Sequence, residues 1–218
     1  MTKAPEKNRI RRKDRILNAA EALFAKHGFE GVSMRMVADS AEVDLALASY
    51  HFGSKRGLFD AVLLRRAEVL NDLRLAALEK CQAEAGGNGP SVEAIIDAFL
   101  HPLLGEGLQA DEGWLHYFEL IAQVNSSYEW GGQLMTKYFD PLVRKFMEAL
   151  KAALPDAEPQ DFYWCYHFLS GALTLTMAHT GRIDQLSDGA VKSEDMVGAY
   201  ERMVPFMAAG FKKMCEKG

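Results

Sequence analysis

Residues 33–55, SMRMVADSAEVDLALASYHFGSK, decide how the first part of the chain folds. Ser33 is a typical N-cap, and the apolar residues after it recur at helical spacing, so a short helix is expected. A break follows near Glu42. Asp44 is a second candidate N-cap, and residues 45–52 are long enough for about two helical turns. Two short helices joined by a turn predict a helix-turn-helix, whose second helix enters a DNA major groove.

The second helix of this pair has few charges. Leu45 and Ala46 could lie against thymine methyl groups, and Ser49 could bond to a base edge or a phosphate. The same run of leucine and alanine also fits a helix that is simply buried. The residues alone leave both interpretations open.

The end of the stretch carries groups that suit phosphate oxygens. Tyr50 and His51 can both donate hydrogen bonds. Lys55 follows Ser54, which would cap another helix, so an ammonium group and the positive end of a helix would face one anion.

The charge of the chain is unevenly distributed. The net charge is -5, but residues 1–66 hold 13 Lys and Arg against 8 Asp and Glu, a net +5, and the remainder carries -10. A basic head on an acidic body is expected if only the head meets phosphate. Chance clustering of solvated charge is the alternative.

A basic cluster leads into the first helix. Its members are Arg9, Arg11, Arg12, Lys13 and Arg15. They could form an arm over the phosphates or in the minor groove, and a frayed, solvated terminus is the alternative. The helix itself is predicted from the apolar stripe that begins at Ile16, and Gly28 is expected to end it.

Several of these motifs together resemble the N-terminal domain of TetR-family transcriptional regulators. They are ILNAAEALF (16–24), Gly28-Phe29, Ser33-Met34-Arg35, Val37-Ala38, Ala41-Glu42-Val43 and YHFGSK (50–55). The resemblance implies an all-α homodimer that binds near-palindromic double-stranded operator DNA. Such proteins usually repress, and they release DNA when a small molecule enters the C-terminal domain. We therefore expect a DNA-binding domain at 1–54 and an effector-binding and dimerisation domain at 55–218.

The resemblance also implies roles for single residues. The family positions that commonly bind DNA phosphates correspond here to Ser33, Arg35, Tyr50, His51 and Lys55. The family's recognition helix corresponds to Asp44, Leu45, Ala46, Leu47, Ala48 and Ser49.

Two positions depart from the family pattern. Glu42 stands where the family often has glycine, so a left-handed conformation there would cost about 1 kcal/mol. Leu45-Ala46 replaces a pair that is often polar, so no base-reading scheme is transferred.

The rest of the chain is predicted to be helical. A long helix should run from residue 55 to about 84, because the next strong loop signal is GGNGP at 86–90. Ser91 should cap the following helix, and Pro141 should kink or restart a later one.

Two late helices are candidates for a subunit interface. Residues 160–180 are apolar on nearly all sides, and residues 196–213 mix large apolar residues with small ones. We expect them to pair about a two-fold axis in a four-helix bundle, with burial in the core of a monomer as the alternative. The candidate interface residues are Phe168, Gly171, Leu175, Met203, Met207 and Phe211.

The central helices are rich in large apolar residues, which favours a small lipophilic effector. The candidate ligand-binding residues are Phe99, Trp114, Phe118, Gln123, Met135, Phe139, Trp164, His167 and Phe168. For any one of the aromatic residues, ordinary core packing is the alternative. The hydrophobic pattern of residues 114–155 is also similar to the TetR subgroup that includes fatty-acid-responsive repressors.

Other classes of function find little support in the sequence. No phosphate loop, GxSxG or HExxH motif is present, and the three cysteines are far apart, so we expect no enzyme, no cofactor and no metal site. No signal peptide or apolar run of about 18 residues is seen, so a soluble cytoplasmic protein is expected. A helical enzyme or carrier with an unused DNA-binding head, and a helical adaptor for another protein, remain as alternatives.

Overall fold

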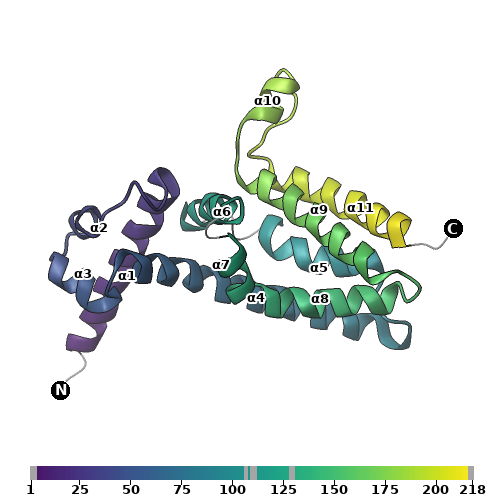
Figure 1. Cartoon of the computed structure of the whole chain (residues 1–218), viewed down its shortest axis with the longest axis horizontal. Helices are drawn as coiled ribbons and strands as arrows, with labels where there is room; N and C mark the ends of the chain where they lie inside the picture. Colours follow the sequence, from purple (N-terminus) through teal and green to yellow (C-terminus); the bar gives the residue numbers. More distant parts are fainter. Residues whose placement is uncertain (1–3, 106–107, 109–111, 128–130, 216–218) are drawn as a thin grey trace.

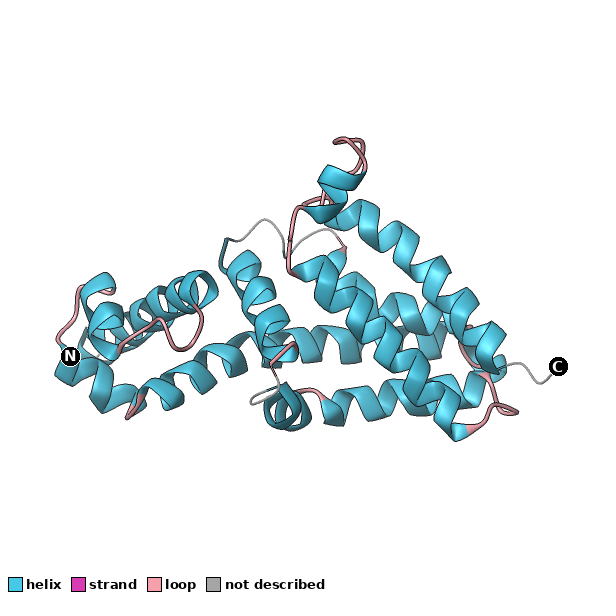
Figure 2. Cartoon of the chain, turned by 45° about the horizontal axis from the view of Figure 1, so that its top comes forward, coloured by secondary structure: helices cyan, strands magenta, loops and turns pink. Residues whose placement is uncertain are grey.

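The computed structural model describes residues 4–105, 108, 112–127 and 131–215, and residues 4–11, 112 and 131 for their backbone alone. Within these ranges it consists of helices and loops, with no strand (Figure 2). The prediction of an all-α protein is confirmed. None of the described helices is both long and apolar enough to cross a membrane.

The N-terminal head consists of three helices and the start of a fourth. These are α1 (Ala4–His27), α2 (Met34–Ser40), α3 (Leu45–Phe52) and α4 (Lys55–Ala85). Figure 1 shows α4 running from the head into the body as one continuous helix, as the sequence predicts. The expected boundary between residues 54 and 55 falls in the turn before α4 and stays a prediction.

The body packs around the second half of α4. After the short 3-10 turn Gly86–Asn88 come α5 (Val92–Leu104), α6 (Glu112–Asn125), α7 (Gly131–Tyr138), α8 (Asp140–Ala153), α9 (Pro159–Met177), α10 (Arg182–Leu186) and α11 (Met196–Cys215). Pro141 lies in the first turn of α8, so it restarts the helix as predicted. The five-residue α10 was not predicted. Together with the loops on either side of it, residues 178–195, it projects from the body and is called the arm below (Figure 1).

The helix caps predicted for the head are present. The hydroxyl oxygen of Ser33 accepts a hydrogen bond from the Met36 amide at 3.2 Å, and that of Ser54 accepts one from the Gly57 amide at 3.1 Å. Gly28, with φ of +67°, directly follows α1. Each cap satisfies a backbone group that a helix end leaves unpaired.

The turn between α2 and α3 is held by Arg15 of α1. Its guanidinium donates to the carbonyl oxygens of Ala41 and Glu42 and lies 3.0 Å from the Glu42 carboxylate. Glu42 has φ of +51°, so the conformation that favours glycine is present without the glycine. The turn therefore carries the backbone strain expected of a left-handed glutamate.

A buried carboxylate joins the head to the long helix. Glu21 of α1 is 2% exposed and lies 2.8 Å from Arg65 and 2.9 Å from Arg66, both on α4. Arg66 also lies over the ring of Trp114 on α6. At Gly113 an added Cβ would lie 1.9 Å from the Arg66 guanidinium, so α6 approaches this cluster closely. Three helices thus meet at one set of charges.

We expect Glu21→Gln to lower the free energy of unfolding by about 3 kcal/mol, because it leaves two largely buried guanidinium groups without their carboxylate. Urea denaturation followed by circular dichroism measures the change. The control is Glu84→Gln, which breaks an exposed pair with Lys80 and should cost less than about 0.5 kcal/mol. Equal losses in the two variants would contradict this account.

We expect Glu42→Gly to be more stable than Glu42→Ala by about 1 kcal/mol, because both variants lose the contact with Arg15 and only glycine relieves the left-handed strain. The same denaturation measurement compares them. If the alanine variant equals the glycine variant, the turn carries no such strain.

Candidate nucleic-acid interface and inner cavity

Helix α3, the predicted recognition helix, turns one face to the head and the other outward. Ala48 is fully buried, whereas Leu45, Ala46, Ser49 and Tyr50 are exposed, and Tyr50 reaches 75% exposure. The spacing of these four residues places them on one side of a helix. The interpretation of a buried helix therefore applies to Ala48 and not to the outward face.

Other predicted DNA contacts surround this helix. Ser33 and Arg35, at the start of α2, are exposed, as are Asp44 before α3 and Arg12 on α1. Asp44 makes no side-chain cap bond, although it is the N-cap residue. The side chain of Arg11 lies outside the described residues.

Lys55 folds back onto the head. Its ammonium donates to the carbonyl oxygen of Phe29 at 3.0 Å, lies 4.2 Å above the Phe29 ring and lies 3.7 Å from the Glu30 carboxylate. Lys55 thus fixes the turn after α1, a role that no local sequence pattern indicates. His51 is half-buried between the rings of Tyr50 and Phe52.

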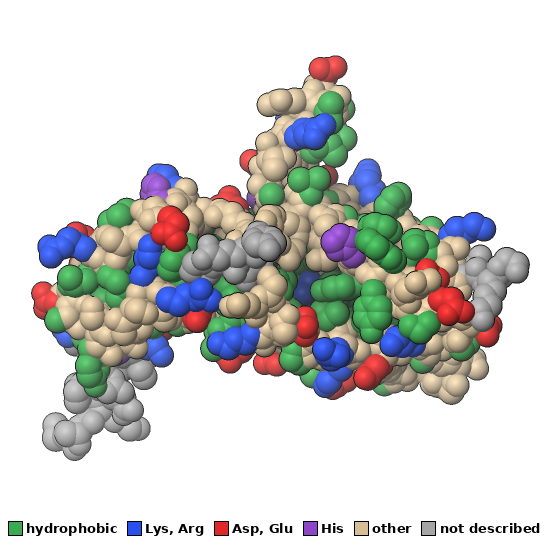
Figure 3. Space-filling view, viewed as in Figure 1, with side chains coloured by type: hydrophobic (Ala, Val, Ile, Leu, Met, Phe, Trp, Pro, Cys, Tyr) green, Lys and Arg blue, Asp and Glu red, His purple; other side chains and the backbone are tan. Residues whose placement is uncertain are grey.

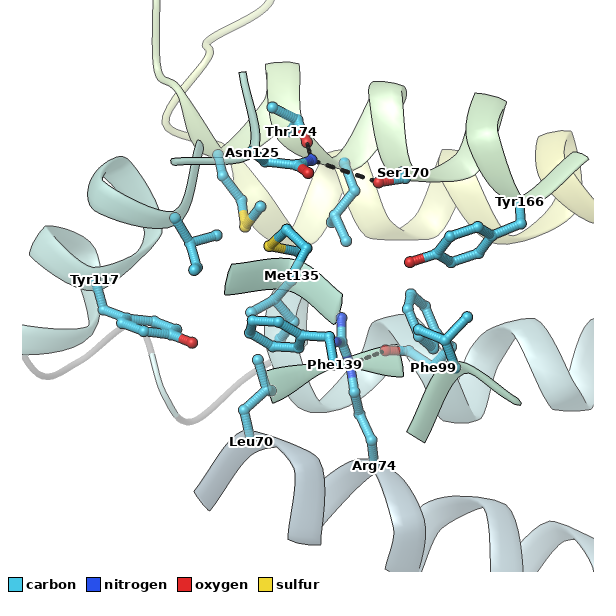
Figure 4. A pocket seen from close by; sticks show the side chains of 15 residues that line it. Leu70, Arg74, Phe99, Tyr117, Asn125, Met135, Phe139, Tyr166, Ser170 and Thr174 are labelled. Carbon is cyan, nitrogen blue, oxygen red and sulfur yellow. Dashed lines mark hydrogen bonds between the residues drawn. The ribbon is translucent and has the colours of Figure 1, made fainter. Parts of the chain in front are cut away.

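A cavity of about 40 Å³ lies inside the body, between α4 and the helices α5 to α9 (Figure 4). It is lined by Leu70, Arg74, Phe99, Leu103, Tyr117, Ile121, Asn125, Met135, Phe139, Val143, Tyr166, Ser170, Leu173, Thr174 and Met177. Three of the predicted ligand-binding residues, Phe99, Met135 and Phe139, are among them.

The other six predicted ligand-binding residues lie elsewhere. Trp114 and Phe118 are buried on α6 but do not line the cavity, and Gln123 donates to the Ala25 carbonyl oxygen of α1 at 2.8 Å. The remaining three, Trp164, His167 and Phe168, lie on the outward face of α9 and contact one another there. Their aromatic character gave no sign of which face of α9 they occupy.

The charged residue of the cavity, Arg74, was not predicted. Arg74 is 4% exposed, its Nε donates to the Phe99 carbonyl oxygen at 2.8 Å, and its guanidinium lies 4.0 Å above the Phe99 ring. Burial lowers the pKa of Arg74 to about 10, so the group remains charged at neutral pH. A signal was present in the sequence, because Arg74 interrupts the buried stripe of α4 between Leu70 and Leu78.

The hydroxyl of Tyr117 on α6 is also buried in the cavity wall. Neither this oxygen nor Nη2 of Arg74 has a hydrogen-bond partner among the described residues. Burial raises the pKa of Tyr117 and of Tyr166, so both hydroxyls stay neutral.

The outer face of α9 and α11 is apolar. On α9, Trp164, Phe168, Gly171 and Leu175 are exposed at helical spacing, and Phe206 of α11 is 73% exposed. Figure 3 shows hydrophobic side chains gathered over α9 and on the arm.

The other predicted interface residues, Met203, Met207 and Phe211, are buried within this chain's own core. Phe206 of the same helix is exposed, whereas these three residues are not on the surface of a single chain.

A groove of about 890 Å³ lies between the arm and the ends of α9 and α11. Leu175, Ile183, Leu186 and Val191 line it and are exposed. Because Leu175 belongs to both features, the groove continues the apolar face of α9.

Two family models match the chain. The model of the C-terminal domain of tetracyclin repressor-like proteins matches residues 97–210, and that of bacterial regulatory proteins of the tetR family matches residues 16–62. The second match covers the helix-turn-helix, and the first covers most of the body.

Relatives and solved structures agree with these matches. The chain is 45% identical over 65 residues to the transcriptional regulatory protein RaaS of Mycobacterium tuberculosis, covering 30% of each protein. It is 29% identical over 121 residues to the transcriptional activator FasR of Mycolicibacterium smegmatis, covering 56% of this chain and 55% of that protein. The chain thus spans less than two thirds of these relatives.

The fold is similar to that of HlyIIR, a hemolysin II transcriptional regulator, with a TM-score of 0.59, 18% identity and coverage of 96% of this chain and 99% of that chain. A TetR-like transcriptional regulator from Rhodococcus sp. RHA1 has a TM-score of 0.56 at 22% identity, covering 91% and 96%. At 18% and 22% sequence identity, these likenesses show a shared fold and nothing more.

Proposed function

Because this chain belongs to the TetR family of transcriptional regulators, we propose that it is a homodimeric, ligand-responsive repressor of its operator. The observation that carries the proposal is the outward face of α3. A short helix that shows small apolar side chains and a serine to solvent, on a basic head, has the surface that a major groove accepts.

We propose that α3 reads bases while its surroundings hold the DNA backbone. Leu45, Ala46 and Ser49 would face base edges, and Tyr50 would bond to a phosphate. Ser33 and Arg35 support a second set of backbone contacts at the start of α2. The amides at the N-terminus of α4 would attract a further phosphate, and the bond from Lys55 to the Phe29 carbonyl oxygen attaches this end of α4 to the turn after α1.

The apolar faces of α9 and α11 support the homodimer. An exposed stripe that contains Trp164, Phe168 and Leu175 is larger than the scattered apolar residues of ordinary monomer surfaces. Gly171 lies in the middle of this stripe, where it would let a partner helix approach closely. Helices α9 and α11 from two copies of the chain would form a four-helix bundle about a two-fold axis. A two-fold dimer suits a near-palindromic operator.

Helix α6 supports the coupling between effector and DNA. Tyr117, Ile121 and Asn125 face the cavity, while Gln123 of the same helix bonds to the carbonyl oxygen of Ala25 on α1. A small molecule that changes the position of α6 would therefore act on the head directly. We propose that this change releases the operator.

We expect Arg35→Ala to weaken binding to the operator and to an unrelated duplex by the same factor, because a phosphate contact carries no sequence information. The slope of log affinity against log salt concentration should fall by about one. Electrophoretic shifts with DNA from upstream of the gene, at several salt concentrations, measure both.

The control for this test is Arg144→Ala, which removes an exposed arginine of α8 and should leave affinity and slope unchanged. If wild-type protein binds no duplex even at low salt, DNA binding through this head is refuted.

We expect Gly171→Phe to dissociate the dimer, because the new ring would stand between the two copies of α9. An added Cβ at Gly171 meets no atom within 4 Å in the single chain, so the monomer fold should be unaffected. Size-exclusion chromatography with light scattering measures the mass.

The matched control is Gly132→Phe on α7, where an added Cβ also meets no atom within 4 Å. This variant should remain dimeric. A dimeric Gly171→Phe protein would place the interface elsewhere.

A further inference from the structure

The inner cavity contains a positive charge that no described residue neutralises. Arg74 is almost fully buried, and it forms no ion pair with any of the described residues. Its contacts are a carbonyl oxygen and the face of the Phe99 ring. A buried guanidinium without a counterion is costly, and proteins usually pair or neutralise such a group.

Two buried polar atoms of the cavity wall have unmet hydrogen-bonding capacity. Nη2 of Arg74 and the hydroxyl of Tyr117 are buried without partners in the described part of the chain. Figure 4 shows the Arg74 guanidinium and the Tyr166 hydroxyl directed into the space between the helices. By contrast, the Asn125 side-chain amide already donates to Thr174 and Ser170, so its N–H groups need no ligand as a hydrogen-bond partner.

The two titratable tyrosines of the cavity wall do not supply the missing negative charge. Tyr117 and Tyr166 remain protonated, because burial raises the pKa of each hydroxyl. They can donate hydrogen bonds to an anion but cannot replace one.

We propose that the effector of this protein is an organic carboxylate with an apolar body, whose carboxylate binds Arg74 and the Tyr117 hydroxyl. The planar guanidinium presents paired N–H donors that match the two oxygens of a carboxylate. The inference rests on the effector-responsive function proposed above and names the chemical class of that effector.

The remaining lining decides against a sugar or a multiply charged phosphate. Leu70, Leu103, Phe139 and Val143 offer no hydrogen bonds, and Arg74 is the one Lys or Arg side chain among the described residues that line the cavity. A single cation in an apolar wall suits a single negative charge on a hydrocarbon or aromatic body.

The cavity must enlarge to hold such a molecule. Its volume of about 40 Å³ accommodates the head group, and the body requires side chains to move. Met135 of α7 and Met177 of α9 line the cavity, and unbranched methionine side chains adopt new rotamers readily. If the bound molecule also displaced α7 or α9, the movement would reach α6, because both helices contact it.

The test measures binding to the full-length protein without DNA. The probes are butanoate, hexanoate, decanoate and benzoate, each compared with the alcohol of the same carbon skeleton. We expect at least one carboxylate to raise the midpoint of thermal unfolding and to bind about 10-fold to 100-fold more tightly than its alcohol, as measured by calorimetry.

Variants of Arg74 separate charge from shape. Arg74→Met should reduce carboxylate affinity to that of the alcohol while leaving the affinity for the alcohol intact, which also shows that the cavity is folded. Arg74→Lys keeps the charge but loses the paired donors, so it should retain a weaker preference for the carboxylate. Arg144→Met removes an exposed arginine and should change neither affinity.

The inference is overturned if no carboxylate binds, if alcohols bind equally well, or if Arg74→Met keeps the preference for the carboxylate. These outcomes are distinct from a failure of the proposed regulatory function. That function is tested by operator binding in the electrophoretic assay, and it could hold while the carboxylate preference is absent.

Discussion

The joint between head and body depends on one buried carboxylate. The Glu21 carboxylate accepts hydrogen bonds from both Arg65 and Arg66, so α1 has one position along α4 in which it meets both guanidinium groups. A shift of α1 by a turn would leave a carboxylate and two guanidinium groups without their partners in a place where water is largely excluded. Because Gly113 of α6 packs against the same cluster, the charges fix the position of a third helix too.

Helix α6 lies between the inner cavity and the N-terminal head. One of its sides is part of the cavity wall, through Tyr117 and Asn125, and its other side contacts α1 through the amide of Gln123. Arg74 lines the cavity on the first side, and Gly113 at the N-terminal end of α6 packs against the Glu21 cluster. The proposed coupling between effector and DNA would therefore need no long chain of residues, since this one helix contacts both the cavity and the head.

Much of the fold could be predicted because its signals are local. Caps such as Ser33 and the stop at Gly28 depend on a few neighbouring residues, and so does the proline restart at Pro141. The fold-back of Lys55 and the burial of Arg74 could not be predicted in this way. Both depend on partners that are distant in the sequence, the carbonyl oxygens of Phe29 and Phe99.

The faces of α9 and α11 show a second limit of sequence patterns. Helix α9 carries apolar residues on nearly every side, and α11 has large apolar residues both on its buried side and on its exposed side, so sequence patterns do not show which of them pack in the monomer. Phe168 and Phe211 were predicted for the same interface, yet Phe168 is 52% exposed and Phe211 is 1% exposed. The aromatic residues of α9 were assigned to a ligand site for the same reason.

The unbroken course of α4 has a geometric consequence. Lys55, in its first turn, and Arg74, in the cavity wall, are 19 residues apart, which is about 28 Å of helix. A tilt of about 8° around Arg74 would therefore displace the first turn by about 4 Å. Adjacent major grooves on one side of DNA recur every 34 Å or so, and in the proposed dimer a rigid helix of this length would convert a small change of angle into a loss of register between two half-sites.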